Sequence, residues 1–351
     1  MKDIEIGNQT IGYNHNPFIV AEMSGNHNQS LETALRIVEE ASRVGCHALK
    51  LQTYTADTMT IDIKDKEFMI NNSKSLWNGY SLYELYKKAS TPWEWHETIF
   101  NRCKELGIIC FSTPFDETSV DFLESLDIPL YKVASFENTD LPLIEKIAKT
   151  GKPMIISTGM ATLSEIYETV QTANVAGCND LILLKCTSTY PSLPTDSNLL
   201  TIPNLYDNFG TIIGLSDHTL GIGSAIASIA LGARVIEKHF TLNRSDGGVD
   251  AAFSMEPMEM KMLVYEANCA FKSLGKIHYG LTQNEKNNKQ YRRSIYAIKN
   301  IFEGDRFSRD NIRRIRPAYG LEPKYFELLL GKKASSSIKK GHAITWENVL
   351  K

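Results

Sequence analysis

Eight short apolar runs recur between residues 18 and 240, and each ends in or is followed by polar residues. They are FIVAEM (18–23), ALKLQTY (48–54), IICFSTP (108–114), LYKVAS (130–135), PMIISTGM (153–160), LILLKCTSTYP (181–191), TIIGLSDH (211–218) and RVIEKHF (234–240). Apolar residues at helical spacing lie between them, as in 119–126, 141–149 and 163–173. Runs this apolar are typical of parallel strands that are buried on both faces. The pattern predicts an α/β fold, a closed (β/α)8 TIM barrel; a doubly wound open sheet is the alternative, but no GxGxxG follows the first run.

Both ends of the chain carry patterns of a different kind. At the N-terminus, DIEIGNQTIGY (3–13) has two short alternating runs around Gly7-Asn8, which predicts a β-hairpin that plugs the bottom of the barrel. Beyond residue 280 the chain has short strand and turn patterns and a local excess of basic residues. We therefore expect a barrel domain over residues 1–280 and a small, mostly β domain over residues 281–351.

The composition gives no reason to expect a nucleic-acid or membrane partner. The 351 residues carry a net charge of -3, and no stretch approaches the roughly 18 consecutive apolar residues of a membrane span. No basic segment followed by an apolar one marks a secretory leader, so we expect a soluble, cytoplasmic protein. The cysteines are scattered without CxxC spacing, which favours reduced thiols over disulfides or a zinc knuckle.

A long polar segment, residues 56–90, separates the second apolar run from a helix that is expected to begin at Thr91-Pro92. Its aromatic residues include Trp77, Tyr80, Tyr83 and Tyr86. This aromatic content argues against a disordered excursion, and loops of such length in compact folds are usually functional. We expect the segment to form a wall over the C-terminal end of the barrel.

Ionisable and hydroxyl side chains stand at the ends of the apolar runs, where the carboxyl ends of barrel strands meet. The candidates are Glu22, Lys50, Gln52, Lys132, Ser135, Glu137, Ser157, Ser188, Tyr190, Ser216 and Glu237, with Asp250 in the loop after the last strand. Their cations and hydroxyls suit a phosphate and a carboxylate, and their carboxylates suit proton transfer. A lysine within a strand is costly to bury without a partner, so Lys50 is expected to face a polar lumen or a bound anion.

Two histidines, His218 and His239, stand at the ends of the last two apolar runs. Imidazoles at neighbouring strand ends can share one metal ion, and a hydrogen-bonded structural role is the alternative for each. By the period-two rule Glu237 shares a face with His239, while Lys238 points the other way. This parity makes Glu237 a candidate to orient a water molecule.

Nine segments of the chain together form a signature. They are IVAEMSGNHNQS, LKLQTY, FSTPFD, YKVASFE, ISTGMA, LKCTSTYP, GLSDHTLG, ARVIEKHFT and RPAYGL. In this order they resemble the sialic acid synthase family over essentially the whole chain. The resemblance implies condensation of phosphoenolpyruvate with a sugar aldehyde and a C-terminal antifreeze-like (SAF) domain. Within the family, GYSLYELYKKASTPWEWH and the stretch from SIYA to RPAYGL are most similar to the branch that uses 2,4-diacetamido-2,4,6-trideoxy-altrose.

The resemblance also implies roles for individual residues. His218 and His239 would bind a divalent metal, typically Mn²⁺, with Mg²⁺ or Co²⁺ as alternatives. The residues that would hold phosphoenolpyruvate are Lys50, Lys132, Ser135, Ser157, Ser188 and Ser216, of which Ser188 is replaced by Asn in some relatives. Tyr190 would line the same pocket. Glu22 and Asp250 would contact the sugar acceptor. Arg316 would reach the acceptor's acyl group from the SAF domain of a partner chain, which requires a homodimer with exchanged domains.

Three other functions remain open from the sequence. N-acetylneuraminate or legionaminic acid synthesis would use N-acetylmannosamine or a related mannose. A metal-dependent barrel hydrolase would need a third ligand, such as an HxH pair after the first strand, where Glu22 stands instead. A non-catalytic carbohydrate-binding or ice-binding protein would have no use for buried lysines and histidines in the barrel.

Overall fold

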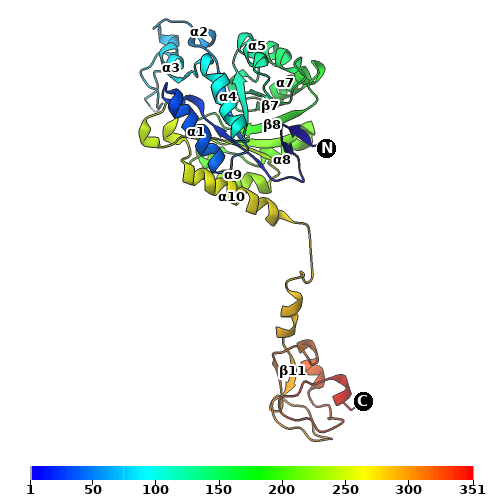
Figure 1. Ribbon diagram of the computed structural model, residues 1–351. Coiled ribbons are helices and arrows are strands. Elements are labelled where there is room, and N and C mark those ends of the chain that lie inside the picture. The colour runs from blue at the N-terminus through cyan, green and yellow to red at the C-terminus, as the bar shows by residue number, and fades with distance from the viewer. Residues whose placement is uncertain (1, 74, 351) are drawn as a thin grey trace. The chain divides into compact units, whose positions relative to one another are not determined.

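Eight parallel strands close into a barrel in the computed structural model, which describes residues 2–73 and 75–350 (Figure 1). The strands follow one another around the barrel in chain order, and the last pairs with the first to close it. They are β3 (Phe18–Glu22), β4 (Ala48–Thr53), β5 (Ile109–Pro114), β6 (Tyr131–Val133), β7 (Met154–Ser157), β8 (Leu181–Cys186), β9 (Ile212–Ser216) and β10 (Val235–His239). The predicted (β/α)8 barrel is therefore confirmed, with one strand in each predicted run.

Helices surround the barrel, and several begin at a side chain that accepts their free N–H groups. They are α1 (Leu31–Arg43), α4 (His96–Glu105), α5 (Glu117–Ser125), α6 (Leu141–Ala148), α7 (Leu163–Val175), α8 (Thr201–Phe209), α9 (Gly223–Ala230) and α10 (Pro257–Leu274). Two further helices, α2 (Ala56–Met59) and α3 (Leu82–Ala89), belong to the long insertion after β4. Ser30 caps α1, Asp116 caps α5 and Thr162 caps α7. The helix expected near Thr91-Pro92 is present, but Pro92 stands at the N-cap position instead of N1: a 3-10 turn over Trp93–Trp95 comes first and continues into α4 at His96.

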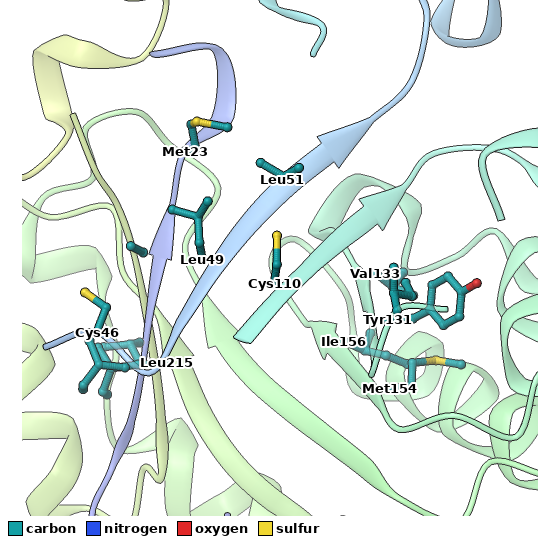
Figure 2. Close-up of a cluster of buried hydrophobic side chains, with 14 of the residues drawn as sticks. Met23, Cys46, Leu49, Leu51, Cys110, Tyr131, Val133, Met154, Ile156 and Leu215 are labelled. Atoms are coloured by element: carbon teal, nitrogen blue, oxygen red, sulfur yellow. The ribbon is translucent and has the colours of Figure 1, made fainter. Parts of the chain in front are cut away.

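The strands bury two separate layers because successive side chains point to opposite faces. Outward-facing side chains such as Leu49, Leu51 and Val133 form one cluster with residues of the surrounding helices (Figure 2). Inward-facing side chains near the strand starts pack with the antiparallel hairpin of β1 (Ile4–Ile6) and β2 (Gln9–Ile11). The hairpin is thus confirmed, and the bottom of the lumen is apolar. The polar side chains that face the lumen therefore lie at the C-terminal end of the barrel.

The C-terminal residues form a second compact unit with a hydrophobic core of its own, which includes Phe307 and Leu329. Its described elements include β11 (Ser294–Ala297), which pairs antiparallel with β12 (Ile312–Ile315), and the short helix α11 (Phe326–Leu329). A Cβ on Gly320, the glycine of RPAYGL, would come within 2.5 Å of the Ile295 carbonyl oxygen. Packing therefore requires glycine at this position.

The two units divide the chain into Met1–Gly275 and Lys276–Lys351. The domain limit that we expected at residue 280 stays a prediction. Among the described helices, none combines the length and the apolar character that a membrane crossing needs.

Two buried histidines are expected to make the barrel sensitive to acid. His27 and His96 are fully buried, and their rings bond to the hydroxyls of Thr91 and Thr53. Burial lowers the pKa of both rings to about 4. An unfolded histidine titrates near pH ~6.5, so below that pH the unfolded chain binds protons that the folded chain excludes. The stability is therefore full above about pH 6.5 and falls as the pH drops towards 4.

Urea unfolding of the barrel checks this expectation. The free energy of unfolding should fall by roughly 2 kcal/mol per histidine between pH 7.5 and pH 5. His96→Gln keeps a donor and an acceptor in place and should remove one histidine's share of the fall, whereas the exposed His278→Gln should change nothing. Identical pH profiles for the wild-type protein and His96→Gln would contradict this cause of acid sensitivity.

Candidate active site

The C-terminal end of the barrel lumen is charged because of the alternation along each strand. On β3 and β10 the inward positions Val20 and Val235 are apolar, and the next inward positions are Glu22 and Glu237. Of the predicted site residues on the strands, Gln52 is half-buried and the others are buried, namely Glu22, Lys50, Lys132, Ser157, Ser216, Glu237 and His239. They lie at the end of the barrel where this fold places its ligands.

Lys50 lies between two carboxylates of this layer. Its ammonium is 3.0 Å from Glu22 Oε2, 3.4 Å from Glu237 Oε1 and 3.2 Å from the Thr113 hydroxyl. Burial alone would lower the pKa of Lys50, but the two carboxylates raise it, so the lysine stays charged. Gln52 donates to the other oxygen of Glu22 at 2.8 Å. Lys50 thus faces a polar lumen, as expected, and its charge is largely neutralised by the protein itself.

Lys132 keeps more of its charge for a ligand. Its ammonium donates to Ser157 Oγ at 2.7 Å and to the Val133 carbonyl at 3.1 Å, and lies 3.9 Å from Glu237 Oε1. Burial lowers the pKa of Lys132, which means that its protein neighbours do not fully compensate the buried cation. An anion beside Lys132 would supply the missing counter-charge.

Hydroxyl groups converge on the turn after β7, next to Lys132. The Gly159 N–H donates to Ser135 Oγ at 3.1 Å, and a Cβ on Gly159 would come within 2.3 Å of Ser188 Oγ and 2.6 Å of Ser135 Oγ. Asn138 holds the turn by donating to the carbonyls of Ser157 and Gly159, both at 3.2 Å. The three serines and the glycine form a cradle that suits the oxygens of a phosphate or carboxylate.

His218 and His239 lie side by side, with ring centroids 5.3 Å apart. His218 Nδ1 donates to the Thr187 carbonyl at 2.9 Å, which leaves Nε2 as the nitrogen for a ligand. His239 Nδ1 is buried without a hydrogen-bond partner among the described residues, 4.0 Å from Asp250 Oδ2. Two such imidazoles fit a metal ion that takes its remaining ligands from substrate and water. Within 2–73 and 75–350, no three His, Cys, Asp or Glu side chains form a complete metal site.

Aromatic rings form a wall beside the two histidines. The Tyr190 ring lies 4.4 Å from that of His218 and 5.3 Å from that of Phe253, measured between centroids. Trp77 of the long insertion lies 5.9 Å from Tyr190, and its indole N–H donates to the Val249 carbonyl at 3.0 Å. The insertion therefore reaches the loop that follows β10, next to Asp250, at the C-terminal end of the barrel.

Asp250 joins the site through the same loop. Its Oδ2 accepts a short hydrogen bond from Ser24 Oγ, and burial raises the pKa of its carboxyl. Ser24 follows β3, so the pair connects the first barrel strand to the loop after the last one. Asp250 is in this way fixed beside His239.

Glu137 and Arg316 differ in their relation to the buried layer. Glu137 lies in the 3-10 turn after β6, and its Oε2 is buried without a hydrogen-bond partner among the described residues. Burial raises the pKa of its carboxyl to about 7, against the opposing effect of Lys132 and Lys50. Arg316 belongs to the second compact unit, where it is exposed and lines a hollow with Arg293, Arg313 and Arg314. All the candidates except Arg316 therefore belong to the barrel unit.

Sequence reasoning did not single out Gly159, Asn138 or Cys186 as site residues. Cys186 Sγ lies 3.8 Å from Ser188 Oγ and 4.0 Å from His218 Nδ1. Burial would raise the pKa of this thiol, but His218 and other site residues lower it to about 7. Cys186 lies two positions after Leu184, whose side chain belongs to the inner apolar layer. Because side chains alternate along a strand, this spacing could have predicted that Cys186 faces the lumen.

Known proteins resemble the chain over both of its parts. Residues 37–279 match the model of the NeuB family, and residues 292–350 match that of the SAF domain. A pseudaminic acid synthase of Campylobacter jejuni is 43% identical over 327 residues, 93% of this chain and 95% of that protein. An N,N'-diacetyllegionaminic acid synthase of the same organism is 36% identical over 330 residues, 93% and 98% of the two chains. The crystal structure of the N-acetylneuraminic acid synthetase of Leptospira borgpetersenii has a TM-score of 0.73 and 32% identity, and the match covers 83% of this chain and 96% of that one.

Proposed function

Because the chain belongs to the NeuB family and carries a SAF domain, we propose that it condenses phosphoenolpyruvate with 2,4-diacetamido-2,4,6-trideoxy-L-altrose, the reaction of a pseudaminic acid synthase. It is a transferase of the class that makes nonulosonic acids from phosphoenolpyruvate. Its identity to the pseudaminic acid synthase of C. jejuni exceeds its identity to the legionaminic acid synthase of that organism. The observation that carries the chemistry is the buried Lys132 with its serine cradle, next to a layer that holds two adjacent imidazoles.

The cradle supports binding of the phosphate of phosphoenolpyruvate. Lys132 supplies a cation whose counter-charge is incomplete, Ser135, Ser157 and Ser188 supply hydroxyl donors, and Gly159 leaves room for the phosphate oxygens. Lys50, which Glu22 and Glu237 hold in place, supplies the second cation. The carboxylate of the substrate lies on the side of the pocket that Lys50 and Ser216 form. Tyr190 closes the pocket and excludes water, which strengthens these charge interactions.

His218 and His239 would hold the divalent metal of the reaction, for which we propose Mn²⁺, with Mg²⁺ or Co²⁺ as alternatives. A metal bound there would polarise the carbonyl of the open-chain sugar. Asp250 and Glu22 accept hydrogen bonds from the hydroxyls of the acceptor and orient its aldehyde carbon towards C3 of phosphoenolpyruvate. A bond forms between these carbons, water adds at C2, and the C2–O bond breaks to release inorganic phosphate and the 2-keto acid.

Glu237 is placed to orient the water that adds at C2. Its Oε1 lies 3.4 Å from Lys50 Nζ and accepts from Ser216 Oγ at 3.2 Å, whereas its Oε2 is buried without a hydrogen-bond partner among the described residues. We expect Glu237→Gln to lower kcat by roughly 10²–10⁴-fold, because general acid–base help is of this size, with little change in KM for phosphoenolpyruvate. Phosphate release measures this, and the exposed Glu145→Gln is the control. Unchanged turnover of Glu237→Gln would remove the residue from the mechanism.

A panel of sugars tests the proposed acceptor. Phosphate release is followed with phosphoenolpyruvate, Mn²⁺ and, in turn, the diacetamido-trideoxy-altrose, the corresponding mannose and N-acetylmannosamine. We expect the highest kcat/KM with the altrose, by at least about tenfold, since each misplaced polar group costs a site this much or more. A preference for the mannose would instead indicate a legionaminic acid synthase. Phosphate release that needs no sugar would indicate a hydrolase.

We infer further that the enzyme is a homodimer with exchanged SAF domains, in which Arg316 of one protomer binds the acceptor's acyl group in the barrel of the other. Co-expression of Lys132→Met and Arg316→Ala chains checks this. Each variant alone should be inactive, but half of the dimers would be mixed and would contain one intact site, so about one quarter of the wild-type activity should return. No recovery in isolated mixed dimers would contradict the exchange.

The same proposal places the enzyme in the cytoplasm. All six cysteines, Cys46, Cys103, Cys110, Cys178, Cys186 and Cys269, are free thiols, and five are buried. Free thiols in a chain of this kind suit a reducing compartment.

A further inference from the structure

Lys238 carries a buried charge that the proposed reaction does not use. It lies on β10 between Glu237 and His239, but its side chain points to the outer face of the barrel. Only 2% of its surface is exposed, and its ammonium donates to three oxygens. These are Asp217 Oδ2 at 2.9 Å and the carbonyls of Thr219 at 2.6 Å and Gly221 at 2.9 Å.

The three acceptors belong to one short segment, residues 217–221, that follows β9. Asp217 Oδ1 also accepts the N–H of Thr219 at 2.9 Å, so the segment turns around the ammonium. The N–H of Asp217 donates to the Glu237 carbonyl at 2.9 Å, which ties the start of the segment to β10 a second time. His218 lies within this turn, between Asp217 and Thr219.

His218 is therefore held from two sides. The contacts of Lys238 fix its backbone to β10, and the Thr187 carbonyl fixes its ring to the loop after β8. β10 also carries His239 on its inner face, one position after Lys238. The strand β10 thus carries the His239 imidazole on its inner face. On its outer face it carries the Lys238 ammonium, which anchors the segment that contains His218.

Stability alone does not account for this arrangement, because a buried ion pair seldom stabilises a fold more than an apolar pair of the same size. We propose that Lys238 is a positioning residue, which sets the separation of His218 and His239 and thereby the affinity for a divalent metal. The inference rests on the metal-binding role proposed above for the two histidines.

Calorimetric titration of Mn²⁺ into the full-length protein, without substrates, tests the proposal. Lys238→Met keeps the length of the side chain and removes the ammonium, and its Kd for Mn²⁺ should rise roughly 10–100-fold, the usual range for residues that orient metal ligands. Asp217→Asn keeps the shape of the partner and should raise the Kd by a smaller factor. In both variants kcat should recover at saturating Mn²⁺, with KM for phosphoenolpyruvate unchanged.

Arg234 offers a matched control. It is also buried, precedes β10 on the same outer face, and donates to the carbonyls of Ala233 and Ile229 at the opposite end of the strand. Arg234→Met should lower the Tm of the barrel and leave the Kd for Mn²⁺ as it is in the wild-type protein.

Each outcome decides the question. If Lys238→Met does not fold, Asp217→Asn carries the test. An unchanged Kd in the folded variants would overturn the positioning role and leave the metal site intact. An equal loss of affinity in Arg234→Met would assign the effect to general loosening of the barrel and reject the proposal. A wild-type protein that binds no Mn²⁺ would overturn the metal site and this inference together.

Discussion

Lys132→Met should reduce kcat/KM for phosphoenolpyruvate by roughly 30- to 5,000-fold. Loss of one partner of a buried charge pair typically costs ~2–5 kcal/mol or more, and the phosphate would have to enter the lumen with its main counter-charge gone. Calorimetry should show a similar rise in the Kd for phosphoenolpyruvate. The Kd for Mn²⁺ should stay within a few-fold of its wild-type value, because the hydrogen bonds of Lys132 go to Ser157 and the Val133 carbonyl and not to either imidazole.

Lys152 provides the control for this substitution. It precedes β7 at the opposite end of the barrel and forms ion pairs with Glu124 at 2.9 Å and Asp127 at 3.4 Å. Lys152→Met removes a lysine of the same kind and should lower the Tm by a few degrees at most, with unchanged binding of phosphoenolpyruvate. A Kd for Lys132→Met within threefold of the wild-type value would remove the cradle from the phosphate site.

His239→Gln should also have a large effect, but on metal binding instead of phosphoenolpyruvate binding. It takes away one of two imidazoles, so the Kd for Mn²⁺ should rise by at least about 10²-fold and kcat should fall by about 10³-fold or more, as loss of carbonyl polarisation costs several kcal/mol. Binding of phosphoenolpyruvate, measured without metal, should be nearly unchanged. Calorimetry with each ligand and phosphate release at several Mn²⁺ concentrations provide the data.

His47 is the control for the metal site. It is part of the barrel but lies before β4, where its Nδ1 accepts the N–H of Ile19 at 2.9 Å and its ring stacks on Phe18. His47→Gln should change stability and leave the Kd for Mn²⁺ as it was. A His239→Gln enzyme that keeps wild-type metal dependence would show that the imidazole pair is structural.

Local patterns in the sequence were sufficient to predict the barrel. Each strand is a continuous apolar run because it is buried on both faces, and the two-residue period put Glu237 and His239 on one face and Lys238 on the other. The same reasoning located the N-terminal hairpin from two alternating runs. Pro92 stands one position before the first helical residue instead of at it, because a proline suits both a first helical turn and the residue that precedes a 3-10 turn.

The contacts between side chains within the site could not be predicted from the sequence. That Lys50 is neutralised by two carboxylates whereas Lys132 is not depends on distances between strands that are far apart in the chain. The Ser135 and Ser188 hydroxyls, which follow β6 and β8, lie where a Cβ on Gly159 would stand, and no local motif indicates this. The outward direction of the Lys238 side chain was predictable. Its hydrogen bonds to the segment that contains His218 were not, because they depend on the turn after β9.

The fate of the bridging oxygen of phosphoenolpyruvate tests the central claim most directly. That claim is that the charged lumen holds the phosphate while carbon attacks a sugar aldehyde and the C2–O bond breaks. Phosphoenolpyruvate labelled with ¹⁸O at the bridging position is turned over with Mn²⁺ and the diacetamido-trideoxy-altrose, and the released phosphate is analysed by mass spectrometry. We expect the label in the phosphate. Unlabelled phosphate, with ¹⁸O kept at C2 of the organic product, would indicate P–O cleavage by a hydrolase and contradict the proposed reaction.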